Sequence, residues 1–322
     1  MTLNVNNWNL HALTNRIQTL LLLVVMGSFM LLLGFLLWGI DGIFILAATG
    51  LILILLNPGI TPRIIMQLYG AYPLTAQQVP FLDSAIRELS RRANLSIAPT
   101  LYYIPSNILN AFSVGRPNNA CIGMSDALLH TLNNQEIVGV LAHEISHIRN
   151  NDMGVMGLAD MFSRLTSILS LFGQILLLIN LPLILLTDVD INWFAIGLLI
   201  LSPNLCALVQ LGLSRTREYD ADLNAARLTG DPEGLARALV KIEHAQGGWL
   251  EHLLLPGRRI PEPSLLRTHP PTSERVKRLM ELKIPDTVYP IQSIIDNDTL
   301  NRLLQARQVK RRPRWHFNGL WH

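Results

Sequence analysis

Four apolar stretches constrain the fold of this chain more than any other feature of its sequence. They lie at about 20–38, 42–56, 168–186 and 193–213. A helix of roughly 20 predominantly apolar residues can cross a bilayer. Only short connections, one containing Asp41 and the other at 187–192, separate the members of each pair. The sequence therefore predicts two tight hairpins made of four transmembrane helices.

The composition also indicates an integral membrane protein. Half of the 322 residues are hydrophobic and 15% are charged, whereas a soluble domain carries about 25% charged residues. The first apolar stretch is too long for a signal peptide, and no small-residue cleavage site precedes the second, so we expect it to be retained. The net charge of +3 creates no strong field for nucleic acid, so no nucleic-acid partner is expected.

The placement of charge predicts the orientation in the membrane. The hairpin tips carry aspartates and no Lys or Arg: Asp41, Asp188 and Asp190. The opposite ends carry arginines: Arg16, Arg63, Arg149, Arg164, Arg215 and Arg217. Because positive charge favours the cytoplasmic side, we expect both termini to face the cytoplasm. The protein is expected to be a multi-pass protein, and a bacterial inner membrane is its expected location.

The pentad His-Glu-Ile-Ser-His at 143–147 carries the clearest chemistry. On a helix, residues four apart share a face, so His143 and His147 can point at one metal ion. Glu144 follows the first histidine and can reach a water on that ion as a general base. This pattern is typical of zinc metallopeptidases.

A catalytic zinc site needs a third protein ligand and an open position for water. Glu218 is the best candidate, because it follows the fourth apolar stretch on the predicted cytoplasmic side. Asp222 lies one helical turn later and could accept the second ring N–H of a ligand histidine. Alternatively, both carboxylates only balance Arg215 and Arg217 on a solvated helix.

The remaining pattern predicts a mainly α protein with a cytoplasmic α+β, zincin-like domain and a small β-sheet. Strands are expected at 100–104, 111–115 and 120–124. Helices are expected at 80–94, from about 133 through the pentad, at 232–246 and at 272–283. Residues 63–72 are interpreted as a connector along the membrane surface, and 247–268 as a loop.

Three further segments accompany the pentad in order: Asn-Ala-Phe at 110–112, residues 214–222 and residues 269–275. With 141–147, they resemble the HtpX-type membrane zinc metalloproteases, relatives of the CAAX prenyl proteases, over roughly residues 15–285. The resemblance implies one Zn²⁺ per chain. It implies His143, His147 and Glu218 as the zinc ligands, Glu144 as the general base and Asp222 behind the ligands.

The oxyanion that develops during peptide hydrolysis needs a further hydrogen-bond donor. His269, held before two prolines, is the candidate, and the resemblance points to the same residue. The alternative is an ordinary residue at a helix start. Arg275 could brace Asp222 or the substrate.

Peptide substrates are expected along the predicted hairpin, because metallopeptidases commonly add an extended substrate to a strand edge. The resemblance places Asn110, Ala111 and Phe112 along this cleft. The alternative is an ordinary core hairpin.

The segments are expected in the following order: cytoplasmic N-terminus 1–16, first membrane hairpin 17–57, a peptidase segment with the pentad 58–164, second membrane hairpin 165–213, a peptidase segment with the third ligand 214–285 and a basic, aromatic tail 286–322. The tail suits anionic lipid headgroups, although a solvated tail fits its composition equally well.

The predicted function is a membrane-anchored zinc endopeptidase whose active site faces the cytoplasm. The resemblance implies that it cleaves membrane or misfolded proteins in quality control and the stress response. Two alternatives stay open: a catalytically silent zinc-binding scaffold, and a site-2-type intramembrane protease. The latter is disfavoured because Glu136, Arg149 and Asp152 flank the pentad and would be costly in hydrocarbon.

Overall fold

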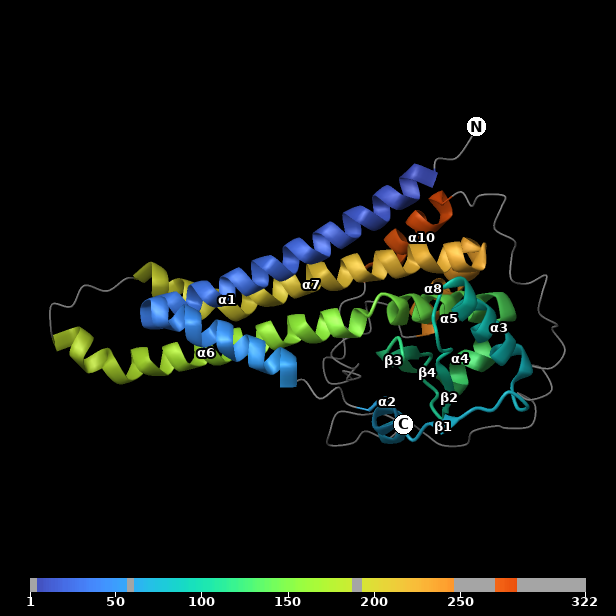
Figure 1. Ribbon diagram of the computed structural model, residues 1–322, viewed down its shortest axis with the longest axis horizontal. Helices are drawn as coiled ribbons and strands as arrows, with labels where there is room; N and C mark the ends of the chain where they lie inside the picture. Colours follow the sequence, from blue (N-terminus) through green and yellow to red (C-terminus); the bar gives the residue numbers. More distant parts are fainter. Residues whose placement is uncertain (1–4, 57–60, 187–192, 246–269, 283–322) are drawn as a thin grey trace. The chain divides into compact units, whose positions relative to one another are not determined.

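The computed structural model describes residues 5–56, 61–186, 193–245 and 270–282 (Figure 1). The chain divides into two compact units. The helical unit comprises Leu10–Pro58 and Gly154–Thr216. The sheet unit comprises Met1–Asn9, Gly59–Met153 and Arg217–His322.

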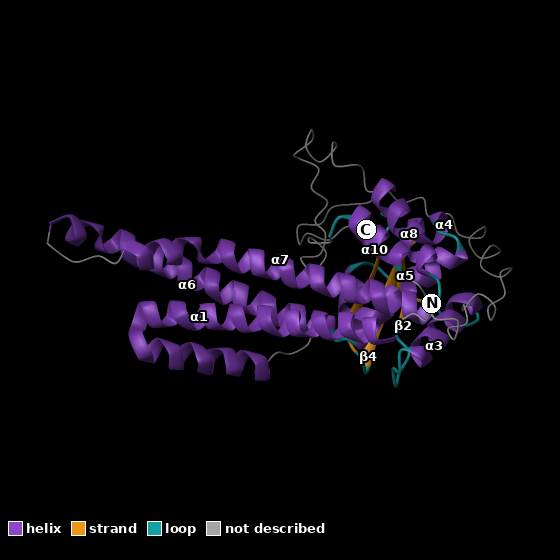
Figure 2. Ribbon diagram, turned by 90° about the horizontal axis from the view of Figure 1, so that it is seen from above, coloured by secondary structure: helices purple, strands orange, loops and turns teal. Residues whose placement is uncertain are grey.

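The helical unit is built from most of three long helices: α1 (Val5–Leu56), α6 (Asp152–Leu186) and α7 (Trp193–Thr229). The first two residues of α6 and the residues of α7 from Arg217 onward belong to the sheet unit. Helix α1 breaks at Gly39, whose φ of 64° and ψ of −145° suit a residue without a side chain. Beyond the break α1 doubles back on itself (Figure 2). A Cβ atom at Gly42 would lie 2.0 Å from the carbonyl oxygen of Gly34, so the two arms meet backbone to backbone, as small residues allow between membrane helices.

The exterior of the helical unit is apolar. Large side chains on all three helices are exposed, among them Phe44 at 67%, Leu178 at 69% and Phe194 at 77%. Three helices of the described chain are long and apolar enough to cross a membrane: Arg16–Ile52, Asp152–Pro182 and Trp193–Thr229. The first two predicted spans both fall on the broken helix α1.

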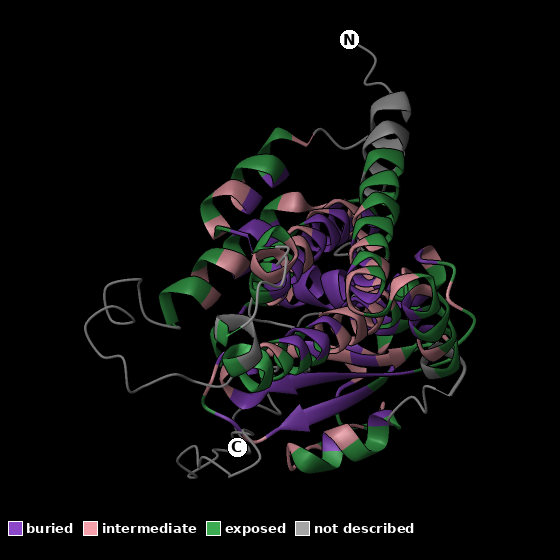
Figure 3. Cartoon of the chain, turned by 90° about the vertical axis from the view of Figure 1, so that its left-hand side faces the viewer, coloured by how far each residue is buried: buried purple, intermediate pink, exposed green. Residues whose placement is uncertain are grey.

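The sheet unit contains a four-stranded mixed sheet in the order β1-β2-β4-β3. Its strands are β1 (Tyr72–Pro73), β2 (Thr100–Ile104), β3 (Ala111–Arg116) and β4 (Asn119–Ser125). Strands β2 and β4 pair in parallel, and the other pairs are antiparallel. Figure 3 colours the strands mostly as buried. The predicted strand at 100–104 and the predicted hairpin are both confirmed.

The helices of the sheet unit are α2 (Pro62–Leu68), α3 (Pro80–Arg92), α4 (Asp126–Thr131), α5 (Asn134–Arg149), α8 (Pro232–Ala245) and α10 (Thr272–Glu281). Local polar contacts fix two of their starts. The Ser125 hydroxyl accepts from the backbone N–H of Leu128 at 3.2 Å at the start of α4. Asn133 and Glu136 exchange hydrogen bonds of 3.0 and 2.9 Å in a capping box at the start of α5.

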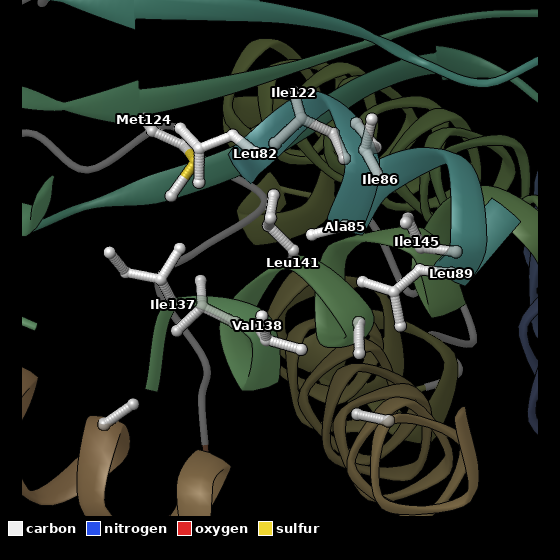
Figure 4. Close-up of a cluster of buried hydrophobic side chains, with 14 of the residues drawn as sticks. Leu82, Ala85, Ile86, Leu89, Ile122, Met124, Ile137, Val138, Leu141 and Ile145 are labelled. Atoms are coloured by element: carbon white, nitrogen blue, oxygen red, sulfur yellow. The ribbon is translucent and has the colours of Figure 1, made fainter. Parts of the chain in front are cut away.

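The core of the sheet unit lies between α5, α3 and β4. Figure 4 shows side chains from these three elements pointing toward one another. Ile137, Leu141 and Ile145, spaced four apart, form the apolar stripe of α5, and each is fully buried at 0% exposure. A stripe at this spacing leaves the other side of the helix to His143 and His147. The core therefore fixes which way the pentad faces.

Candidate metal centre

Three side chains of the sheet unit converge on one point. The Nε2 atoms of His143 and His147 lie 3.1 Å apart on α5. Glu218, on α7, places one carboxylate oxygen 3.5 Å from His143 Nε2 and the other 3.6 Å from His147 Nε2. One ligand atom from each side chain lies within 4.8 Å of the others. The geometry therefore brings together the three residues predicted to bind zinc.

The opposite ring nitrogens of both histidines face carboxylates. His147 Nδ1 lies 2.7 Å from Asp152 Oδ2. His143 Nδ1 lies 3.0 Å from Asp222 Oδ1, which is close enough for ion pairing but without hydrogen-bond alignment. Because a carboxylate favours a proton on the nitrogen it faces, we assign a proton to Nδ1 of both rings, which leaves each Nε2 to face the point of convergence.

This assignment tests whether the residues fit a metal ion. With a proton on each Nδ1, both Nε2 atoms and the carboxylate of Glu218 face the same point, where they repel one another unless a proton or a metal ion lies between them. Two imidazole nitrogens and one carboxylate oxygen form a ligand set that zinc uses in catalytic sites. The donor set therefore fits Zn²⁺.

Arg275, on α10, braces the centre. Its Nε and Nη2 donate to the two oxygens of Asp222 at 2.7 and 2.6 Å. Its Nη1 lies 3.1 Å from Glu218 Oε2, and the side chain is only 4% exposed. The bidentate fork fixes the plane of a carboxylate in a way that a lysine could not. Arg275 thus contacts both the third candidate ligand and the carboxylate behind His143.

In the metal-free centre, burial and the neighbouring charges shift the pKa values of these groups. Burial raises the pKa of Asp222, but Arg275 outweighs burial and lowers it to about 2. Burial lowers the pKa of His143, but Asp222 and Glu218 outweigh burial and raise it to about 10. Burial likewise lowers the pKa of Arg275, while Asp222, Glu218 and Glu144 raise it above its ordinary value. The centre therefore favours positive charge.

Sequence reasoning does not identify Asp152 and Arg217 as members of the site. Asp152 is the first residue of α6, and Arg217 directly precedes Glu218 on α7. In the sequence, both are charges that flank apolar segments. The polar turn after the pentad is the only local signal, because these two residues meet only when the chain folds.

Of the predicted substrate-binding residues, Ala111 and Phe112 begin β3 and Asn110 directly precedes it. Strand β3 is an edge strand among the described residues. Ser125 N donates to the carbonyl of Asn110 at 3.0 Å, and Asn110 N donates to the Ser125 hydroxyl at 3.0 Å. Hydrogen-bonding residues alternate along an antiparallel strand, so the backbone N–H and C=O of Phe112 also face β4. The backbone groups of Ala111 and Ser113 face away from β4. The Phe112 side chain is buried at 8% exposure.

Two predicted catalytic residues remain, Glu144 and His269. Glu144 lies on α5, directly after His143, and is 8% exposed. His269 lies outside the described residues.

Comparisons with known proteins identify the family of this chain. The model of Peptidase family M48 matches residues 76–283. A Protease HtpX homolog of Pyrococcus abyssi is 33% identical over 282 residues, which cover 83% of this chain and 96% of that relative. A Protease HtpX homolog of Syntrophobacter fumaroxidans is 34% identical over 284 residues, which cover 83% of this chain and 99% of that relative. The chain belongs to peptidase family M48.

Among solved structures, the crystal structure of S. mikatae Ste24p matches 86% of this chain and 66% of that chain, with 22% sequence identity and a TM-score of 0.41.

Proposed function

We propose that this member of peptidase family M48 is a membrane-anchored, zinc-dependent endopeptidase. The observation that carries the proposal is the convergence of His143, His147 and Glu218, whose ligand atoms lie within 4.8 Å of one another. When bound there, zinc supplies Lewis acidity, which activates water at neutral pH and polarises a peptide carbonyl.

The residues of the chain supply the remaining steps. Glu144 is the general base: its carboxylate accepts a proton from the attacking water and returns it to the leaving amine. Arg275 holds Asp222 and Glu218 in place. His269 is proposed to donate to the developing oxyanion.

The substrate is proposed to bind as an extended strand along β3. Ala111 and Ser113 direct their backbone groups away from β4, so they suit hydrogen bonds with a peptide backbone. Gly115 N, next in the alternation, donates to Met153 Sδ at 3.0 Å. Of the predicted substrate residues, Ala111 is therefore the best supported, and we add Ser113. Asn110 and Phe112 direct their backbone groups toward the β4 side, so these groups are not available to a peptide at the edge of the sheet.

We further propose four membrane spans in two hairpins, with α1 contributing both of the first two through its break at Gly39. The proposed cytoplasmic orientation and the segment boundaries given above rest on charge placement and hydropathy, and the proposed bacterial inner membrane rests on the resembled family. The proposed substrates are membrane or misfolded proteins in quality control, by analogy with the resembled family.

Cleavage of an unfolded reporter such as casein by detergent-purified protein tests this function. The parent protein and Glu144→Gln are purified in chelator and assayed with and without added zinc. We expect zinc-dependent cleavage that Glu144→Gln abolishes without loss of bound zinc. Glu233→Gln, at an exposed position on α8, is the matched control and should cleave normally. Bound zinc with no cleavage in the parent would favour the scaffold alternative, and no bound zinc would refute the proposal.

A further inference from the structure

A second Arg–Asp pair lies behind the metal centre, on the side of His147. Asp152 Oδ2 faces His147 Nδ1 at 2.7 Å, and Arg217 Nε donates to Asp152 Oδ1 at 2.6 Å. Arg217 Nη2 also contacts the same oxygen. The Arg217 and Asp152 side chains are 8% and 5% exposed. One oxygen of Asp152 thus serves the histidine and the other serves the arginine.

This arrangement repeats the one behind His143. There, Asp222 faces the ring and Arg275 holds Asp222. The two pairs come from different elements, since Asp152 begins α6 and Arg217 belongs to α7. Both candidate histidine ligands of the described chain are therefore backed by a buried carboxylate that an arginine holds.

From this geometry we propose that Asp152 and Arg217 are positioning residues for His147 as a metal ligand. The inference rests on the proposed zinc centre. A carboxylate at Nδ1 fixes the ring orientation and the tautomer, and it makes Nε2 a stronger donor to a metal. Arg217 orients that carboxylate and offsets its charge, because an unpaired buried carboxylate would be costly.

The position of Arg217 strengthens the assignment. It directly precedes Glu218, so α7 supplies both the third candidate ligand and the cation that fixes the partner of His147. A shift of α7 would therefore disturb two candidate ligands together.

Zinc affinity, measured by competition with a chromogenic chelator, tests the proposal. The full-length chain is used in detergent, in the Glu144→Gln background to prevent self-cleavage. Asp152→Asn should weaken zinc binding about 10–100-fold, as expected when the partner of a ligand histidine is lost. It should also change the absorption spectrum of the cobalt-substituted protein, which a purely structural role would leave unchanged.

Asp220→Asn is the matched control. Asp220 is a buried carboxylate that lies 3.8 Å from the same arginine and accepts from Asn150 at 2.7 Å. Its replacement should leave the zinc affinity within roughly threefold of the parent. Arg217→Met should weaken zinc binding, and Arg217→Lys should restore part of the lost affinity. These two variants test the proposal even if Asp152→Asn does not fold.

The outcomes separate this proposal from the zinc centre itself. If the parent binds zinc and the Asp152 and Arg217 variants bind it equally tightly with an unchanged cobalt spectrum, the positioning role is wrong. If the parent binds no zinc, the metal centre fails and the assignment fails with it.

Discussion

Arg275 offers a quantitative test of the electrostatics of the centre. Its guanidinium contacts both oxygens of Asp222 and lies 3.1 Å from Glu218. Arg275→Met keeps most of the side-chain volume but leaves two buried carboxylates without this cation. Removing one member of a buried ion pair costs about 3–5 kcal/mol. We expect the free energy of unfolding of the metal-free protein to fall by that amount.

The pKa of Asp222 gives a second order-of-magnitude figure. Its decrease from 3.8 to about 2, at about 1.4 kcal/mol per unit, corresponds to about 2–3 kcal/mol. Because the folded pKa is lowered, this stability is fully present above pH 3.8 and is lost as the pH falls toward 2. In the Arg275→Met protein, most of this contribution to the free energy of unfolding should be absent even at neutral pH.

Pulse proteolysis across a denaturant series measures the difference, in the Glu144→Gln background with chelator present. Arg278→Met on the same helix is the control, because Arg278 is 54% exposed and pairs with Glu274 on the surface. It also lies over the ring of Tyr219, so we expect a loss of about 1 kcal/mol or less. If Arg275→Met costs no more than Arg278→Met, the ionic account of the centre is refuted.

Three further predictions concern the core, the helical unit and the strand edge. Leu141→Ala should lower the free energy of unfolding by about 2–5 kcal/mol, whereas Ile97→Ala, at an exposed position, should change it little in the same proteolysis experiment. Gly42→Leu should disrupt the α1 hairpin and lower the thermal midpoint in detergent; Gly197→Leu, where an added Cβ meets nothing within 4 Å, should be tolerated. Ser113→Pro should lower kcat/KM for casein about 3–10-fold, the value of one backbone hydrogen bond, and unchanged turnover would argue against substrate binding on this edge.

Much of the sheet unit can be predicted because its signals are local. Side-chain caps and the alternation of apolar residues depend on near neighbours, so the start of α5 after its cap Asn133 and the strand at 100–104 are predictable. The two histidines of the candidate metal centre are also predictable, because their spacing of four on one helix expresses the chemistry directly. The prediction of Glu218 depends instead on its position after the fourth apolar stretch and on the resemblance.

Long-range arrangements cannot be predicted in this way. The pairing of Arg217 with Asp152 and the parallel register of β2 with β4 depend on how distant segments meet. The sequence favours a connector along the membrane at 63–72, yet residues 62–68 form helix α2, whose Met66 is fully buried against the sheet at 0% exposure. Its mixed pattern allows either interpretation, because one apolar face can meet lipid or protein.

Zinc content combined with X-ray absorption at the zinc edge tests the central claim most directly. For the Glu144→Gln protein reconstituted with zinc, we expect one zinc per chain, bound by two imidazole nitrogens and oxygen ligands. Glu218→Gln should weaken this binding, whereas Glu274→Gln should not. A protein without stoichiometric zinc, or with zinc retained equally after replacement of His143, His147 and Glu218, would contradict the proposed centre.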